Sequence, residues 1–316
     1  MQFSTITEEL QVTEFRKGIE RELEAFFEAK GYRLIQPRIF QGYDSFVCSN
    51  LRQDSSKTVK VLGGDSRIFI LRPDITTNIL HQIFSKWEGS PPLKVYYNSK
   101  IYRNQPAGGI LEHYQMGVES LGEDSLKGDQ EMIEMAAALM GTLGEPFIIE
   151  LGSSKYLDGF FKELDLDLET EGVLRDLISK KNRDGLRRRV RALGLEDTVL
   201  STILEMEGNM ESVLDRAKSY ERNDEMMAAL DELEGLREFF STRALLRNIH
   251  FDLSMMPDLD YYDGIIFKGY ALNTPKKILS GGRYDRLTQR FGKTVSAIGF
   301  MLDMDLVTRI RIKGEA

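Results

Sequence analysis

The chain has 316 residues, of which 41% are hydrophobic and 29% charged, and its 42 basic and 50 acidic residues give a formal net charge of −8. This composition is typical of a globular protein with a buried core and room for a second, smaller domain. The acidic balance argues against a dedicated nucleic-acid binder. The N-terminus lacks the basic start and apolar core of a signal peptide, and no apolar run approaches the ~20 residues that span a bilayer, so we expect a cytoplasmic protein.

The cysteine and histidine content predicts neither a disulfide nor a metal centre. The single cysteine, Cys48, excludes an internal disulfide framework, and a buried structural thiol is favoured over a nucleophile. The histidines show no metal-ligand spacing with one another or with Cys48; they are His81, His113 and His250. We therefore expect no metal and no cofactor.

The first half of the chain predicts a helix followed by strands. Apolar residues recur at helical spacing over 8–30, and Gly31 stands where this helix should end. A short extended run over 32–37 follows, and further strands are expected over 67–71, 93–103 and 113–119. Because short, turn-rich links join them, an antiparallel arrangement is favoured over repeated βαβ units. A helix over 129–143 should follow, with Asp129 as its N-cap.

Composition changes near residue 151, where glycine-punctuated segments rich in Leu, Glu, Lys and Arg begin. Helices are expected over 155–164, 170–180, 184–193, 197–207 and 224–240. Strand-like sequence returns over 250–254, 263–270 and 277–279, followed by a tight turn at 281–284 and a last helix beginning near 296–300. The sequence thus predicts an α+β core formed by 1–150 and 246–316, with 151–245 as a helical insertion.

The basic segment Lys180–Arg191 is the stretch whose charge would attract nucleic acid. Leu186, Val190 and Leu193 give it an amphipathic pattern, so a solvated helix face is favoured. Contact with an acidic partner surface is the second hypothesis.

Several stretches, taken in order, resemble the catalytic core of class II aminoacyl-tRNA synthetases, and of histidyl-tRNA synthetases in particular. They are Gly31–Pro37 with Tyr43–Phe46, Leu71–Thr77, Ile101–Arg103 with Glu112–Glu119, and Leu259–Phe267 with Ser280–Asp285. The first of these four stretches is similar to the dimer-forming motif 1, and the second to the loop that holds the amino-acid amine. The third is similar to motif 2, and the fourth to the histidine-specific segments. The resemblance covers about residues 8 to 308 and implies an antiparallel sheet flanked by helices.

The departures from that family lie where ATP is handled. An arginine and a glycine of the family correspond to Pro257 and Asp258, and the Gly-Leu-Glu-Arg of motif 3 corresponds to Asp303–Leu306, so Leu306 replaces a phosphate-binding arginine. The motif 2 loop over 103–112 also lacks the family's acidic and basic pair. Adenylate formation needs positive charge around the reacting phosphate. Loss of one such donor costs about 3 kcal/mol of transition-state stabilisation, so these changes predict a chain that forms no adenylate.

The same resemblance implies a histidine pocket. Its residues would be Asp74, Thr76, Arg103, Gln115, Glu119, Tyr262 and Tyr284. Alternation along a strand would put Gln115, Gly117 and Glu119 on one face, with space beside the glycine. In the family, the matching glutamine binds the backbone end of histidine and the matching glutamate binds its imidazole. A solvated polar strand face is the alternative.

The other pocket residues also have structural alternatives. Asp74 stands where the family usually has glutamate and would hold the ligand ammonium with Thr76, or would form a turn after Arg72. Arg103 would pair with the ligand carboxylate or form an ordinary ion pair. Tyr262 would contact the imidazole while Tyr261 points the other way, or would be a packed tyrosine with a satisfied hydroxyl. Tyr284 would lie near the pocket.

The family that combines this core with these losses is that of the ATP phosphoribosyltransferase regulatory subunits. The resemblance implies a non-catalytic homodimer, formed through the motif 1 region, that docks on a short catalytic subunit and is required for its activity and for feedback by L-histidine in the first step of histidine biosynthesis. The chain stops at residue 316 without an anticodon-binding domain, so no tRNA partner is expected. The alternatives are a truncated histidyl-tRNA synthetase-like enzyme that forms an aminoacyl adenylate, and a scaffold with a vestigial pocket.

Overall fold

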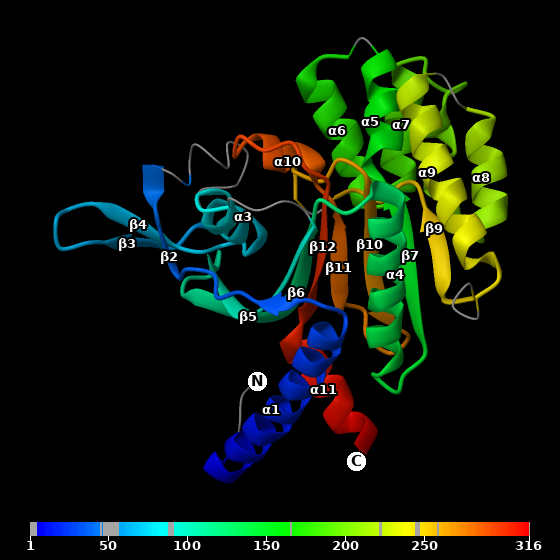
Figure 1. Cartoon of the computed structure of the whole chain (residues 1–316). Coiled ribbons are helices and arrows are strands. Elements are labelled where there is room, and N and C mark those ends of the chain that lie inside the picture. Colours follow the sequence, from blue (N-terminus) through cyan, green and yellow to red (C-terminus); the bar gives the residue numbers. More distant parts are fainter. Residues whose placement is uncertain are drawn as a thin grey trace. The chain divides into compact units, whose positions relative to one another are not determined.

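The computed structural model describes residues 5–44, 46, 57–87, 92–164, 166–220, 223–243, 247–257 and 259–315. Contacts divide it into two compact units, a first unit formed by Met1–Glu123 with Leu287–Ala316 and a second unit formed by Asp124–Arg286. The short helix α10 (Asp285–Gln289) spans the boundary in the sequence. Figure 1 labels the elements of both units. Cys48, Ser45 and Asp258 lie outside the described residues.

Long antiparallel strands form the centre of the first unit. Its described strands run in the order β1 (Arg33–Leu34), β5 (Leu93–Asn104), β6 (Ile110–Leu121) and β12 (Ala297–Asp303). β1 is parallel to β5, whereas β5 and β12 are both antiparallel to β6. Glu119 on β6 therefore has Val95 opposite it on one side and Gly299 on the other. This arrangement confirms the expected antiparallel pairing.

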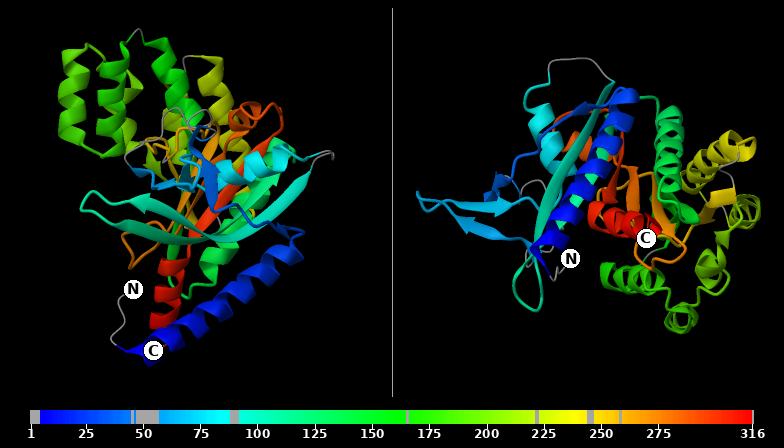
Figure 2. Two further views of the ribbon diagram at one scale, coloured as in Figure 1. Left: turned by 90° about the vertical axis from the view of Figure 1, so that its left-hand side faces the viewer. Right: turned by 90° about the horizontal axis from the view of Figure 1, so that it is seen from below.

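Helix α1 (Ile6–Ala29) covers one face of these strands. The Phe27 ring packs against Tyr96 on β5 and Phe300 on β12, with centroids 5.7 and 6.5 Å apart. The Tyr96 hydroxyl also donates a 2.8 Å hydrogen bond to Glu28. Figure 2 shows this helix beside the C-terminal helix α11 (Met304–Glu315), which contacts it. The amphipathic helix expected over 8–30 is confirmed.

Helix α3 (Thr76–Phe84) lies against the opposite face. The Tyr114 hydroxyl on β6 donates to Glu20 of α1 at 2.8 Å. Because side chains alternate along a strand, Glu119 points the other way, where it accepts a hydrogen bond from Thr76. Both faces of β6 are thus covered, and its residues from 116 to 121 are all buried. The helix α3 was not expected from the sequence.

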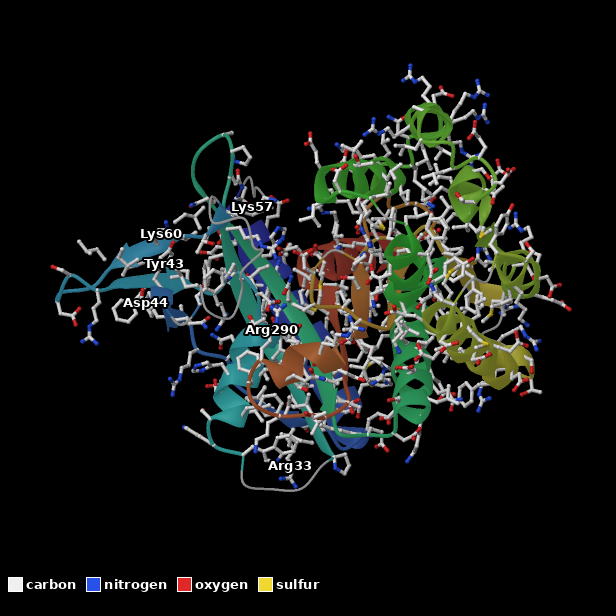
Figure 3. The ribbon with its side chains drawn as sticks, turned by 90° about the horizontal axis from the view of Figure 1, so that it is seen from above. Arg33, Tyr43, Asp44, Lys57, Lys60 and Arg290 are labelled. Atoms are coloured by element: carbon white, nitrogen blue, oxygen red, sulfur yellow. The ribbon has the colours of Figure 1, made fainter. Side chains whose placement is uncertain are left out.

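A smaller antiparallel sheet belongs to the same unit. Its strands run in the order β2 (Phe40–Gly42), β4 (Ile68–Leu71) and β3 (Lys60–Leu62). Figure 3 shows Tyr43 and Lys60 close together here, and the Lys60 ammonium lies 4.9 Å from the centroid of the Tyr43 ring. Leu62 and Ile68 stand opposite each other on β3 and β4 and are both exposed.

The second unit contains the remaining strands. They run in the order β11 (Leu279–Arg283), β10 (Ile265–Ala271), β7 (Phe147–Ser153), β9 (Ile249–Asp252) and β8 (Glu207–Gly208). β7 and β9 are parallel, and the other neighbouring pairs are antiparallel. Helix α4 (Ser125–Gly141) packs against β7 and β10. The strand β7 was not expected from the sequence.

The segment after β7 is mostly helical, as its composition predicts. Its helices are α5 (Ser154–Glu163), α6 (Leu168–Ser179), α7 (Arg183–Ala192), α8 (Met210–Lys218) and α9 (Asp224–Ser241). Four of the expected helices are confirmed, and α8 was not expected. On α7 the apolar Leu186 and Val190 are buried while Arg187, Arg188 and Arg191 are exposed, which confirms a solvated basic face.

The helix expected over 197–207 is wrong. The chain there forms two short 3₁₀ turns, Val199–Ser201 and Ile203–Glu205. β-Branched residues are restricted in a helix, and Val199, Thr202 and Ile203 lie close together in this segment. Helical spacing of apolar residues alone was therefore not sufficient evidence for an α-helix.

Asp129 is not the N-cap of its helix. Helix α4 begins at Ser125, and the carboxylate of the preceding Asp124 accepts a 3.1 Å hydrogen bond from the Lys127 N–H. Asp129 lies one turn further on and is buried. Both aspartates fit the preference for an N-cap. Asp124 takes that position, because tertiary contacts bury Asp129 inside the helix.

Two expectations for the last part of the chain are also wrong. Residues 296–300 do not begin a helix, because Ala297–Asp303 forms β12 and the helix starts at Met304. Gly299 lets this strand approach β6 closely, since an added Cβ would collide with the Glu119 carboxylate. Residues 281–284 do not form a tight turn either, because Gly281 and Gly282 pair with β10 as part of β11.

Within the described ranges, no helix combines the length and apolar character that crossing a bilayer requires.

Candidate ligand-binding site

The predicted pocket residues are divided between the two units. The first unit contains Asp74, Thr76, Arg103, Gln115 and Glu119, and the second contains Tyr262 and Tyr284. The geometry of the candidate site is therefore that of two groups of side chains, each held by its own unit.

A buried carboxylate lies at the centre of the first group. Glu119 is 2% exposed on β6, and the Thr76 hydroxyl at the start of α3 donates a 2.6 Å hydrogen bond to its Oε1. Its Oε2 lies against Gly299, where any larger residue would collide with it. Burial of an ionised carboxylate is costly unless polar or cationic groups compensate for lost water. Glu119 is therefore a fixed, water-excluded acceptor, and the solvated-face alternative does not hold for it.

Asp74 shapes the loop before α3. Its Oδ2 accepts hydrogen bonds from the Thr77 N–H at 2.8 Å and the Thr77 hydroxyl at 2.7 Å. A carboxylate that accepts a hydrogen bond from an N–H in the first turn stabilises the start of a helix. The structure thus gives Asp74 a local structural role beside Thr76, and this role also fixes the direction of its side chain.

Arg103 holds the same loop from β5. Its Nε and Nη2 donate to the Pro73 carbonyl at 3.2 and 3.0 Å. No carboxylate among the described residues pairs with Arg103, so the ordinary ion pair considered above is not found there. Arg103 and Asp74 are brought close together through Pro73.

The space expected beside Gly117 is already filled. Gly117 pairs with Tyr97 on β5, and a Cβ at this glycine would collide with the Tyr97 hydroxyl and the Phe300 carbonyl. Gln115, two residues away on the same face, is half-buried. Tyr97 is therefore a site residue that sequence reasoning missed. The signal for it is the pairing register, which the sequence alone does not give.

The second group is a cluster of tyrosines. The Tyr261 ring lies 5.0 Å from the Tyr262 ring and 5.8 Å from the Tyr284 ring, in the second case edge to face. We expected Tyr261 to point away from the other two tyrosines. Its ring instead lies against both of them. Gly282 makes room for this cluster, since a Cβ there would be 2.8 Å from Tyr262. Edge-to-face contacts orient such rings.

A buried ion pair supports the strand that leads to Tyr284. The Arg283 guanidinium donates to Asp129 at 2.5 Å and to Asp285 at 3.1 Å, and to the Ser125 carbonyl at 2.7 Å. Burial raises the pKa of the Asp129 carboxyl to about 7, although Arg283 opposes the rise. This network was also missed, because 154 residues separate Asp129 from Arg283.

The positions that depart from the synthetase pattern have structural roles here. The Asp303 carboxylate ends β12 and accepts a 3.0 Å hydrogen bond from the Leu306 N–H, so it caps α11. Leu306 is 7% exposed in the apolar interior of the first unit. In the second unit, Pro257 is half-buried in the segment after β9. No cationic side chain occupies these three positions.

In the described parts of the chain, His81 packs against an aromatic ring. The His81 ring meets the Phe291 ring edge to face at 6.3 Å. Among those residues, no group of three or more His, Cys, Asp or Glu side chains has the arrangement to hold a metal ion.

Sequence comparisons place the chain near two kinds of protein. A family model described as histidyl-tRNA synthetase matches residues 9–307. The ATP phosphoribosyltransferase regulatory subunit of Clostridium novyi is 32% identical over 304 residues, which cover 93% of this chain and 72% of the relative. That of Acetivibrio thermocellus is 30% identical over 299 residues, with the same two shares.

Structural comparisons confirm the expected α+β fold. An ATP phosphoribosyltransferase regulatory subunit/histidyl-tRNA synthetase from Bacillus halodurans superposes with a TM-score of 0.87 at 24% identity, over 98% of this chain and 81% of that one. A chain of the ATP phosphoribosyl transferase (HisG:HisZ) complex from Thermotoga maritima gives 0.72 at 17% identity, over 92% and 97%. The architecture is that of the class II synthetase core, mostly antiparallel strands flanked by helices.

Proposed function

The chain belongs to the ATP phosphoribosyltransferase regulatory subunits, within the histidyl-tRNA synthetase family, and on this premise we propose that it regulates an ATP phosphoribosyltransferase and catalyses no step itself. The observation that carries the proposal is the 30–32% identity to subunits of that name over more than nine-tenths of the chain. Its partner is the short catalytic subunit, which joins ATP to phosphoribosyl pyrophosphate in the cytoplasm, the first step of histidine biosynthesis. The partnership is supported by the likeness to a chain of the Thermotoga maritima complex.

The residues at the former ATP-handling positions support a non-catalytic role. Asp303 is engaged as a helix cap and Leu306 packs in the interior, so neither position offers positive charge to a phosphate. Transition-state stabilisation in adenylate formation depends on fixed cationic donors. A truncated synthetase-like enzyme would need such donors from elsewhere in the chain.

The ligand of the regulatory site is proposed to be L-histidine. Glu119 supplies a buried carboxylate held by Thr76, suited to an imidazole N–H. Gln115, Asp74 and Arg103 supply polar groups for the backbone end of an amino acid. The family resemblance also proposes Tyr262 and Tyr284 as ligand contacts; in the second unit Tyr262 is half-buried, whereas Tyr284 is 1% exposed. Binding of histidine would inhibit the partner through a difference in affinity between two states of the complex.

We also propose that the subunit forms a homodimer through its motif 1 region. Leu34 and Phe40 in this region are 51% and 52% exposed, and Ile39 between them is similarly exposed. Exposed apolar residues that cluster in one segment are typical of interaction surfaces.

We further propose a core formed by 1–150 with 246–316, and an insertion formed by 151–245. The run of helices from α5 to α9 supports this division.

Co-purification with a short ATP phosphoribosyltransferase tests the function. The catalytic subunit alone should show little activity, and addition of this chain should restore activity and make it sensitive to histidine. Failure to form a complex, or activity unaffected by this chain, would contradict the regulatory role.

A pyrophosphate-exchange assay with each amino acid tests the alternative that the chain is an enzyme, since histidine-dependent exchange would show that it forms an adenylate. Calorimetric titration with histidine separates a sensor from a scaffold with a vestigial pocket.

A further inference from the structure

A cavity in the second unit carries arginines that the proposed function does not use. Its volume is about 460 Å³, and it lies where α9 ends, α8 begins and β9 starts. Its lining contains the basic side chains Arg237, Arg243, Arg247 and His250, with Glu211 as an acidic neighbour. Three guanidinium groups around one cavity of this size indicate an anionic occupant.

Two of these guanidinium groups are held in place by their own surroundings. Arg237 donates to the Glu234 carboxylate from both Nε and Nη2, at 2.9 and 2.5 Å. The Arg243 guanidinium lies 3.5 Å from the Phe239 ring centroid and 3.6 Å from Glu134. Such contacts reduce the entropy that these side chains lose when they bind a ligand. They also neutralise part of the positive charge of the cavity.

Arg247 is the member of the cluster with its hydrogen-bonding capacity still available. It is exposed just before β9, and it makes no hydrogen bond or ion pair with any residue in the parts of the chain that the structure describes. Its guanidinium carries five N–H donors in a planar fork. That fork matches the oxygens of a phosphate group.

The start of α8 adds to the attraction for anions. Asn209, Met210 and Glu211 line the cavity, and α8 is nine residues long. A helix N-terminus carries partial positive charge. The Asn209 side chain already accepts hydrogen bonds from the N–H groups of Glu211 and Ser212, at 3.0 and 3.3 Å, so the helix acts here through its dipole more than through free donors.

We propose that this cavity binds an oligophosphate anion, such as inorganic pyrophosphate or the phosphate chain of a nucleotide. A single carboxylate ligand would engage one guanidinium, whereas linked phosphates present several oxygens to several arginines at once. The volume falls within the usual range for small-molecule sites. The site consists of residues of the second unit alone, and it is independent of the predicted histidine pocket.

Calorimetric titration of the full chain with inorganic pyrophosphate, and separately with ATP, tests the proposal. Both ligands should bind saturably, more weakly at higher salt, and tighter binding of ATP would identify the nucleotide as the preferred source of the phosphates. Arg247→Ala should weaken binding by about tenfold, as expected for loss of one charge-assisted contact. Glu211→Gln should strengthen binding severalfold, because it removes a negative charge from the lining.

Arg188→Ala is the matched control. Arg188 is exposed on α7 in the same unit and does not line the cavity, so its loss changes net charge equally without touching the site. Affinity unchanged in Arg188→Ala and reduced in Arg247→Ala supports the proposal. Equal losses in both variants, no saturable binding by the wild-type chain, or equally tight binding of glutamate as a carboxylate probe would overturn it.

Discussion

The Thr76 hydroxyl donates a 2.6 Å hydrogen bond to the Glu119 carboxylate, which joins the first turn of α3 to β6 across 43 residues of sequence. The bond fixes the direction of a carboxylate that is almost fully removed from water. A buried carboxyl group oriented in this way would need little further desolvation on contact with a cationic or N–H-donating ligand.

Glu119→Gln should weaken histidine binding by at least about tenfold, because a charge-assisted hydrogen bond becomes a neutral one. Titration calorimetry on the purified chain measures the change. Glu112→Gln is the control, since Glu112 lies on the same strand but is exposed and paired with Lys100. A similar loss in both variants would show that Glu119 does not contact the ligand.

Gly117→Ala should lower the free energy of unfolding by about 1–3 kcal/mol, the usual cost of an inserted methyl group in a packed interior. The new Cβ would collide with Tyr97 and with the Phe300 carbonyl. Urea denaturation measures the change. Gly172→Ala on α6, where a Cβ meets nothing within 4 Å, should be neutral or stabilising. If Gly117→Ala proves equally harmless, the Tyr97 ring does not fill the space beside β6.

The Asp129 carboxyl provides a prediction about pH. Its folded-state pKa is raised to about 7 by burial, above the ordinary value of 3.8. A raised carboxyl pKa means that the folded state holds its proton more tightly, so this stabilisation is present at low pH and is lost as the pH rises from about 4 to about 7. The unfolding free energy of the wild type minus that of Asp129→Asn should therefore fall as the pH rises across that window. The fall should be on the order of 1 kcal/mol per pH unit at most.

Chemical denaturation at several pH values measures this difference. Asp184→Asn, an exposed change on α7, is the control and should leave the slope against pH as in the wild type. A difference for Asp129→Asn that grows with pH would mean that attraction to Arg283 outweighs burial.

Asp303→Ala should destabilise the chain by about 1 kcal/mol, because the N–H of Leu306 loses its cap. Asp303→Asn should retain most of the stability, since asparagine also caps helices and removes only the charge. Thermal unfolding compares the two variants. If the alanine variant is as stable as the wild type, the hydrogen bond from Leu306 to Asp303 does not stabilise α11.

Leu34→Asp should disrupt the proposed homodimer, because it places a charge in an exposed apolar segment. Sedimentation velocity should show a shift from dimer to monomer. Leu168→Asp is the control, since Leu168 is 88% exposed on α6 outside the motif 1 region. A dimer that survives Leu34→Asp would place the interface elsewhere.

Elements with a long, regular pattern could be predicted from the sequence. The apolar spacing of α1 and α9 and the strand pattern of β5 and β6 gave the correct type, because local propensity and tertiary packing agree there. The helix α3 has nine residues and follows a proline loop, so its apolar run carried little helical signal. The strand β12 was taken for a helix, since its small residues have meaning only beside β6.

The contacts of the candidate site could not be predicted from the sequence. Motif order proposed Thr76 and Glu119 as pocket residues, and their role toward a ligand stays a prediction. Their hydrogen bond, and the Tyr97 ring beside Gly117, depend on the register between strands, which a single sequence does not specify. The pairing of Asp129 with Arg283 required the fold of the whole second unit.

The cap that Asp303 forms on α11 also limits which residues the start of this helix can accept. An arginine in place of Leu306 would enter an apolar interior without a partner for its charge, and replacement of Asp303 by a residue that cannot cap would weaken the start of α11. Each of these substitutions would therefore cost folding stability. Folding stability by itself therefore favours the present residues at both positions.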